Sequence, residues 1–212
     1  LMKTFILIAA ILAIALCSVP IPSGPAGIQY KDSPLARVRL DVFEDILCSD
    51  CKAFDPPFKQ FLNSEYEGRP MTDFVEVVFH PYILPAHSNS FTVSMLIPFV
   101  WDLHHNGTIS AAFNEWCFEH QQEYLYTAAR DLSEMDVIRK VCNETQGLFG
   151  YTYDECFETL ESYKYLADIH NAQKFGANYR IYMTPTVMVN GVQLEFETQP
   201  KEADEWFNYL QC

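Results

Sequence analysis

Basic residues are scarce in this sequence. Its 212 residues include 14 lysines and arginines against 28 aspartates and glutamates, and the formal net charge is −14 at pH 7. A surface this acidic repels phosphate backbones and anionic lipid headgroups, which disfavours nucleic acid and membrane surfaces as partners. We interpret the acidity as a property that keeps the protein soluble.

The sequence also lacks internal repeats, low-complexity tracts and an apolar run long enough to span a bilayer. The apolar run over residues 5–16 is shorter than the roughly 20 residues of a spanning helix. Lys3 precedes this run, and Ala15 and Cys17 stand at its end with the spacing of a signal-peptidase site. We therefore expect residues 1–17 to be a cleaved signal peptide, whose removal moves the formal charge from −14 to −15. A retained membrane anchor and a lipoprotein signal ending at Cys17 are the weaker alternatives.

Two glycosylation triplets agree with a secretory destination. They are Asn106-Gly107-Thr108 and Asn143-Glu144-Thr145. We therefore expect a secreted glycoprotein, or a protein of the secretory lumen or a lysosome-like compartment, in a eukaryotic cell. The final four residues are no retrieval signal, which disfavours stable residence in the endoplasmic reticulum.

Hydrophobic periodicity predicts a small α/β sheet that is interrupted by a block of helices. Residues 18–35 contain four prolines and two glycines and are predicted to be a linker. Strands are predicted over residues 38–43, 74–79, 186–189 and 192–196, with a tight turn at Asn190-Gly191. Helices are predicted over residues 52–66, 87–105, 108–124, 133–146 and 152–174, and from about residue 200.

A Cys-x-x-Cys pair, Cys48-Ser49-Asp50-Cys51, follows the first predicted strand and begins the first predicted helix. The first sulfur of such a pair lies beside unpaired backbone N–H groups and the positive end of the helix dipole, which favour the thiolate. Cys48 is therefore the predicted nucleophile. Cys51, one turn further on, is predicted to resolve a mixed disulfide by forming a Cys48–Cys51 disulfide. The alternatives are a permanent structural disulfide and half of a zinc site.

Neither a metal nor another cofactor is expected. Zinc needs two further ligands, and the sequence contains no second Cys-x-x-Cys and no His-x-x-x-His. The histidines fall in predicted loops and on helical faces without metal or triad spacing, so none is assigned a catalytic role: His80, His87, His104, His105, His120 and His170.

A second signal is the proline that enters a predicted strand in Met183-Thr184-Pro185-Thr186-Val187. A proline at this place forfeits a hydrogen bond of the sheet. A cis peptide bond that holds the preceding backbone against a neighbouring loop is one reason to place it there. An ordinary proline at the start of a strand is the alternative.

These motifs resemble those of the DsbA-like family of thioredoxin-fold thiol–disulfide oxidoreductases. The similar segments are residues 42–51, residues 183–191 and residues 79–85, which lead into a helix. The resemblance covers about residues 36–212. It implies an α/β, thioredoxin-like sheet with a helical insertion between the second strand and the cis-proline hairpin. The implied division is a first core part over residues 36–85, the insertion over 86–171 and a second core part over 172–212.

The resemblance also assigns roles within the predicted site. It implies that Cys48 attacks the substrate and that Cys51 resolves the mixed disulfide. Pro185 is then the cis residue that faces them, and the backbone of Thr184 is offered to a bound substrate strand.

The sequence departs from the family pattern near the cysteines. Family members often carry Pro-His or Pro-Trp between them, where this chain has Ser49 and Asp50. A carboxylate beside a forming thiolate raises the thiol pKa, so Asp50 predicts a weaker oxidant. The family's usual buried acid, six residues before the first cysteine, is replaced by Val42. Asp41 or Asp45 is the expected proton relay.

The leading functional hypothesis is an enzyme that exchanges disulfides with protein or peptide substrates, together with a redox partner that the sequence does not identify. The first alternative is a binding or chaperone-like module on the same fold. A glutathione-dependent isomerase or transferase is another, although such relatives tend to replace a cysteine by serine. A lysosomal thiol reductase would show further cysteine- and histidine-rich signatures, which are absent from the sequence.

Four further cysteines remain after signal cleavage: Cys117, Cys142, Cys156 and Cys212. Four cysteines allow three pairings. We favour Cys142–Cys156, because these residues flank the Gly147–Gly150 turn between two predicted helices. Pairing of Cys117 with Cys212, a free Cys212 and plain buried thiols remain open.

Overall fold

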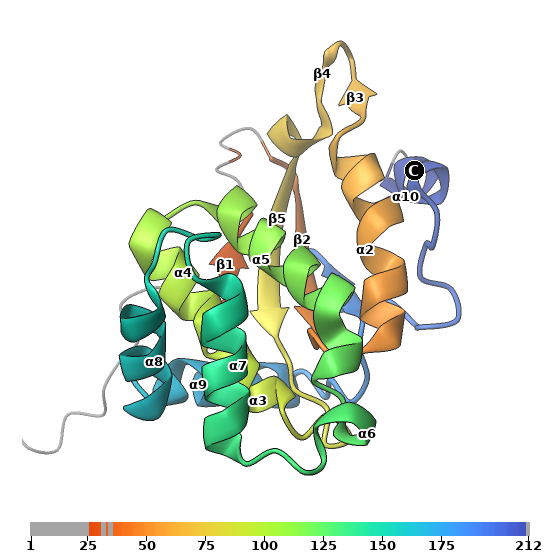
Figure 1. Ribbon diagram of the computed structural model, residues 1–212. Helices are drawn as coiled ribbons and strands as arrows, with labels where there is room; N and C mark the ends of the chain where they lie inside the picture. Colours follow the sequence, from red (N-terminus) through yellow and green to blue (C-terminus); the bar gives the residue numbers. More distant parts are fainter. Residues whose placement is uncertain (1–25, 31–32, 34–35, 211–212) are drawn as a thin grey trace, which may run out of the picture.

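The computed structural model describes residues 26–30, 33 and 36–210, so the predicted signal peptide lies outside the described residues. The centre is a mixed five-stranded sheet in the order β1-β5-β2-β6-β7 (Figure 1). Strands β2 and β5 are parallel, and the other neighbouring pairs are antiparallel. The strands are β1 (Ile28–Gln29), β2 (Val38–Glu44), β5 (Val75–Pro81), β6 (Thr186–Val189) and β7 (Val192–Gln193), with a separate hairpin of β3 (Glu65–Tyr66) and β4 (Arg69–Pro70).

Helices cover both faces of this sheet. The crossover from β2 to β5 contains α2 (Ser49–Leu62) and the 3₁₀ turn η1 (Met71–Asp73), and the chain ends with α10 (Ala203–Leu210) beside α2. Between β5 and β6 the chain forms a helical insertion, which Figure 1 shows as a group of helices beside the sheet. Its elements are α3 (Ser90–Ser94), α4 (Leu96–His104), α5 (Gly107–His120), η2 (Gln121–Glu123), α6 (Tyr126–Ala129), α7 (Glu134–Thr145), α8 (Tyr153–Glu161) and α9 (Leu166–Asn178).

Alternation of side chains along β2 creates two cores. Leu40 and Val42 lie on the face covered by α2 and α10, in one buried cluster with Trp206. Phe43 lies on the opposite face, in a cluster with Tyr82, and its ring stacks on Phe175 of α9. The insertion has its own core, formed by buried side chains of α3 to α9. The two faces of β2 therefore offer different surroundings to the polar residues that share the strand.

The predicted α/β architecture with a helical insertion is confirmed, whereas some element boundaries differ. The predicted linker over residues 18–35 includes β1, because Ile28 is buried and pairs with β5. The predicted helix over 152–174 is two helices, because Tyr163 has φ +53° and separates α8 from α9. The predicted turn at Asn190-Gly191 is confirmed: both residues have positive φ, as the tight hairpin turn requires.

Candidate active site

Cys48 and Cys51 lie where the chain passes from β2 into α2. Cys48 is the N-cap residue of α2, with φ −80° and ψ 127°, and Cys51 follows in the first turn. Both are free thiols. Cys48 is 6% exposed and Cys51 is completely buried, while Ser49 and Asp50 between them are exposed. Cys48 is therefore the more accessible of the two sulfur-bearing residues, as a nucleophile must be.

The two thiols have opposite pKa shifts. The hydrogen bond from the Cys51 thiol has the largest influence on Cys48. With the Thr184 side chain and the backbone N–H groups of Cys51 and Asp50, it outweighs burial and lowers the pKa of Cys48 to about 6. Burial raises the pKa of Cys51 well above its ordinary range, helped by the bond to Cys48 and the charge of Glu44. At pH 7, Cys48 is therefore mainly a thiolate and Cys51 a thiol.

The loop before β6 faces the reactive sulfur. The Thr184–Pro185 peptide bond is cis. In the thiol form, Cys48 donates a hydrogen bond to the carbonyl oxygen of Thr184, with 3.4 Å between sulfur and oxygen. Thr184 and Pro185 are both buried. The structure thus brings together all four residues to which the sequence analysis gave a catalytic or substrate-binding role.

A buried acid that the sequence analysis did not single out lies behind the cysteines. Glu44 ends β2 and is 4% exposed, and neither of its carboxylate oxygens has a hydrogen-bond partner among the described residues. Burial raises the pKa of Glu44 well above its ordinary value; the charges of Asp55 and Cys48 add to this effect, and Lys59 opposes it. Glu44 is two residues after Val42 and so shares its strand face. That alternation was the available sequence signal.

The two aspartates expected as proton relays are both held by hydrogen bonds with other side chains. Asp45 is 1% exposed. Its carboxylate accepts hydrogen bonds from four groups, which hold the turn before Cys48 against the start of the insertion: Leu47 N, Leu84 N, Ser90 Oγ and a His87 ring nitrogen. Asp41 lies on the strand face opposite Glu44. The relay role of Asp41 or Asp45 therefore stays a prediction, and the structure adds a further candidate, because Glu44 is the buried acid whose charge acts on Cys51.

The carboxylate of Asp50 was expected to raise the pKa of Cys48. That pKa is lowered overall, and the backbone N–H of Asp50 contributes to the lowering. The residue is exposed, and water screens an exposed charge. The local backbone therefore outweighs the residue type between the cysteines.

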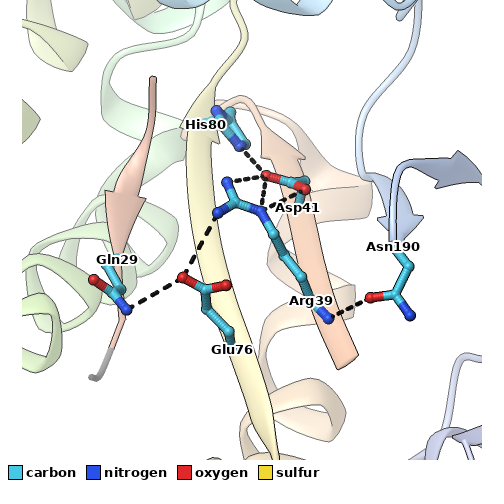
Figure 2. Close-up of polar contacts among 6 residues, drawn as sticks. All are labelled: Gln29, Arg39, Asp41, Glu76, His80 and Asn190. Atoms are coloured by element: carbon cyan, nitrogen blue, oxygen red, sulfur yellow. Dashed lines mark hydrogen bonds and ion pairs between the residues drawn. The ribbon is translucent and has the colours of Figure 1, made fainter. Parts of the chain in front are cut away.

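Asp41 belongs to a polar network on the α9 side of the sheet, drawn in Figure 2. Its carboxylate lies 2.8 Å from Nε2 of His80 and accepts hydrogen bonds from the Arg39 guanidinium. His80 is completely buried, and its ring stacks against those of Phe43 and Phe175. Further contacts join Arg39 to Glu76 and to Asn190, and Glu76 to Gln29. His80 and His87, which received no role from sequence, are thus structural partners of aspartates.

A cavity of about 310 Å³ opens beside the reactive pair. Pro185 and Asp50 line its end nearest the cysteines, and four of the eight other lining residues are phenylalanines or prolines. Its other lining residues are Ala53, Phe54, Pro57, Phe196, Gln199, Pro200, Lys201 and Glu202. The cavity thus provides an apolar surface with a polar rim next to the cis-proline loop.

The remaining predicted sites lie away from the cysteine pair. A disulfide joins Cys142 of α7 to Cys156 of α8, the pairing favoured from sequence. Cys117 is a buried free thiol, and Cys212 lies outside the described residues. Asn106 and Asn143 are both exposed.

Within residues 26–30, 33 and 36–210, no group of three or more His, Cys, Asp and Glu side chains is placed to hold a metal ion. In the same part of the chain, no helix has the length and apolar character to cross a membrane.

Comparison with known proteins agrees with this geometry. The thioredoxin family profile matches residues 33–209. No curated protein matches the sequence. Similar solved structures include DsbA from Chlamydia trachomatis, with 16% identity, a TM-score of 0.66 and coverage of 92% of this chain and 95% of that one. BdbD from Bacillus subtilis has 17% identity, a TM-score of 0.65 and coverage of 87% and 91%. Wolbachia pipientis α-DsbA1 has 18% identity, a TM-score of 0.62 and coverage of 93% of both chains.

The family profile spans most of the chain, including the cysteine pair and the cis-proline loop. The similar structures share the sheet with its helical insertion over nearly their whole length. The chain therefore belongs to the thioredoxin family and has the DsbA-like form of its fold.

Proposed function

We propose that this protein is a thiol–disulfide oxidoreductase that exchanges disulfides with protein or peptide substrates through Cys48 and Cys51. The observation that carries the proposal is the division of roles between the two sulfurs at the start of α2. The pKa of Cys48 is about 6, whereas the pKa of the buried Cys51 is raised well above its ordinary range. At neutral pH, Cys48 is therefore the ionised nucleophile, and Cys51 is the protonated thiol that resolves the mixed disulfide.

The exchange follows from these protonation states. The Cys48 thiolate attacks a substrate disulfide, forms a mixed disulfide and releases one substrate sulfur as a thiolate. Cys51 then gives up its proton, and its thiolate attacks the Cys48 sulfur. The Cys48–Cys51 disulfide forms, the second substrate sulfur leaves, and the substrate is reduced by two electrons. The reverse sequence oxidises a substrate dithiol.

Glu44 is the proposed proton partner of Cys51. The Glu44 carboxylate would accept the proton that Cys51 loses, and its protonated form would return that proton when Cys51 is the leaving group. Burial raises the pKa of Glu44, so its carboxyl group holds a proton more readily than an exposed glutamate does, and the charge of Glu44 acts on Cys51. Because Glu44 has no competing hydrogen bond among the described residues, its carboxyl group is available for this transfer.

The cavity beside Pro185 is the proposed place for the substrate chain. Pro185 lines it, the carbonyl oxygen of the preceding Thr184 lies next to the Cys48 sulfur, and the walls of the cavity are largely apolar. An extended substrate segment in the cavity would lie with its disulfide above Cys48. The backbone of that segment would form hydrogen bonds with the cis-proline loop. A partner that regenerates the pair would use the same surface.

We also propose an oxidising location for this activity, in the secretory pathway or outside the cell. The Cys142–Cys156 disulfide supports such a compartment. Asn106 and Asn143 are exposed and accessible to glycosylation. Cleavage after residue 17 would leave a chain whose core consists of residues 36–85 and 172–212, with the insertion over residues 86–171 between them. A mass decrease on N-glycosidase treatment of the secreted protein, absent after Asn106→Gln and Asn143→Gln, tests the glycosylation.

Insulin reduction and substrate trapping test the activity. We expect Cys48→Ser to abolish exchange and Cys51→Ser to accumulate mixed disulfides, because only the second variant keeps the nucleophile. Cys117→Ser, which changes a buried thiol outside the site, is the matched control and is expected to keep full activity. Undiminished turnover by Cys48→Ser would contradict the proposal. A reduction potential near about −120 mV would indicate an oxidase, and one near about −270 mV a reductase.

A further inference from the structure

The helical insertion reaches the reactive cysteine through Gln121. This residue begins η2, directly after α5, and is 1% exposed. Its Nε2 donates a hydrogen bond to the carbonyl oxygen of Cys48, at 3.2 Å, from a position 73 residues later in the chain. The same carbonyl accepts the N–H of Lys52, at 3.1 Å. The peptide unit that follows Cys48 is therefore held from inside α2 and from the insertion.

The position of Gln121 is imposed by a helix that is itself fixed. Phe118, three residues earlier, lies on the same side and packs against Cys48 and Cys51. Helix α5 contacts α2, and Figure 1 shows the two running side by side. At the other end of α5, a Cβ atom on Gly107 would lie only 2.0 Å from the Gln29 carbonyl oxygen, so glycine permits this close approach to β1. Helix α5 is thus anchored near both of its ends, and Gln121 follows it directly.

The bond to the Cys48 carbonyl acts on the sulfur through the backbone. The backbone N–H groups of Asp50 and Cys51, in the first turn of α2, favour the ionised form of the Cys48 sulfur. A rotation about ψ of Cys48 would move both this carbonyl and those N–H groups relative to the sulfur. The amide of Gln121 also places the positive end of its dipole at this turn, which favours a nearby negative charge. Both effects have the same sign.

We propose that Gln121 is a positioning residue: it holds the Cys48 peptide unit so that the following backbone N–H groups stabilise the thiolate, and through it the helical insertion sets the reactivity of Cys48. The inference rests on the proposed function, because in that function the Cys48 thiolate is the group that attacks the substrate disulfide. The thiolate itself can be measured without any turnover, so the two proposals fail separately.

The test is the pH profile of Cys48 alkylation by iodoacetamide in the full, reduced chain, with the modified residue identified by mass spectrometry. We expect Gln121→Leu to slow alkylation at pH 6 by roughly threefold to tenfold, the cost of about one hydrogen bond. The alkylation rates of variant and parent should approach one another at pH 9, where Cys48 is ionised in both proteins. Gln121→Glu has the same size, cannot donate when ionised and adds a like charge, so we expect a larger decrease. Gln122→Leu changes the exposed neighbour and is expected to leave the profile unchanged.

Unchanged profiles in both Gln121 variants would overturn the inference. Far-UV circular dichroism checks that each variant is folded, and if Gln121→Leu unfolds, the isosteric Gln121→Glu decides. Loss of structure in both would also overturn it, because Gln121 would then be a requirement of folding. The Gln121 variants could shift the alkylation profile even if the parent protein exchanges no disulfides. That result would support the positioning role and contradict the proposed function.

Discussion

Strand β2 carries a buried carboxylate on each of its two faces, and the surroundings of the two are opposite. Burial alone would raise the pKa of Asp41, but hydrogen bonds with His80 and Arg39 outweigh it and lower that pKa to about 2. Glu44 lies three residues later on the α2 face, and the described residues offer it no hydrogen bond. Burial therefore raises its pKa well above the ordinary value.

The comparison shows that partners decide what burial does to an acid. Asp41 is 7% exposed and Glu44 is 4% exposed, so both are largely removed from water, and Glu44 is the more deeply buried of the two. Asp41 is ionised across the neutral range and acts as a structural anion. Glu44 holds its proton to a higher pH than an exposed glutamate does. A carboxylate left without partners costs stability, and such a cost is common at sites that need a perturbed group.

Removal of the paired carboxylate should have the largest effect on stability. We expect Asp41→Ala to lower the free energy of unfolding by about 3 kcal/mol, because His80 is left buried beside a half-buried Arg39 without their common anion. Urea unfolding measures this loss. Glu76→Ala removes a more exposed partner of Arg39, 3.6 Å away, and should cost less than about 1 kcal/mol. Equal losses in the two variants would contradict a special role for Asp41.

The pH dependence of stability should separate the two carboxylates. The pKa of Asp41 is about 2 in the folded chain against an ordinary value of 3.8. Its contribution, roughly 2 kcal/mol, is therefore complete above pH 3.8 and is lost as the pH falls through 2. Glu44 acts in the opposite sense: its contribution is complete below its ordinary pKa of 4.5 and is lost as the pH rises. Unfolding of the parent, Asp41→Asn and Glu44→Gln from pH 2 to 8 tests both signs. If the stability difference between parent and variant changed with pH in the same direction for Asp41→Asn and Glu44→Gln, the opposite roles of the two carboxylates would be contradicted.

Replacement of the unpaired acid should stabilise the fold and impair exchange. We expect Glu44→Leu to raise the free energy of unfolding at pH 7 by about 1–2 kcal/mol, because a buried group without partners is replaced by an apolar one. The same variant should slow disulfide exchange, since Cys51 loses its proton partner. Glu44→Gln keeps the size and a buried polar group, so it should slow exchange without the gain in stability. A stable Glu44→Leu variant with full activity would leave Glu44 without a catalytic role.

The exposed carboxylate beside the cysteines should matter least. Asp50 is solvated, so its charge is screened. We expect Asp50→Asn to change the rate of Cys48 alkylation at pH 6 by less than about twofold in 0.15 M salt. The measurement is the alkylation profile described above, repeated in 1 M salt. A change above fivefold that disappears at high salt would show that the carboxylate faces the sulfur after all.

The sequence by itself determined the reactive pair and its partner loop. Cys48 and Cys51 could be predicted because a strand, a turn and a helix start are local features, and backbone N–H groups at a helix start favour a thiolate wherever it occurs. The cis peptide bond at Thr184–Pro185 was implied by the family resemblance, and the structure contains it. The pairing of Cys142 with Cys156 was favoured because a short turn brings neighbouring helices together.

Only the tertiary structure decided which distant groups act on this pair. Asp41 and Glu44 are close in sequence, yet their pKa values also depend on groups that other elements supply, among them His80 and Lys59. Gln121 carries no local sign of its role, because its hydrogen bond to Cys48 exists only once α5 is packed against α2. Backbone preferences act over a few residues and are readable along the chain. Burial and pairing arise between segments far apart, and they settle the charge of a side chain only after the fold has formed.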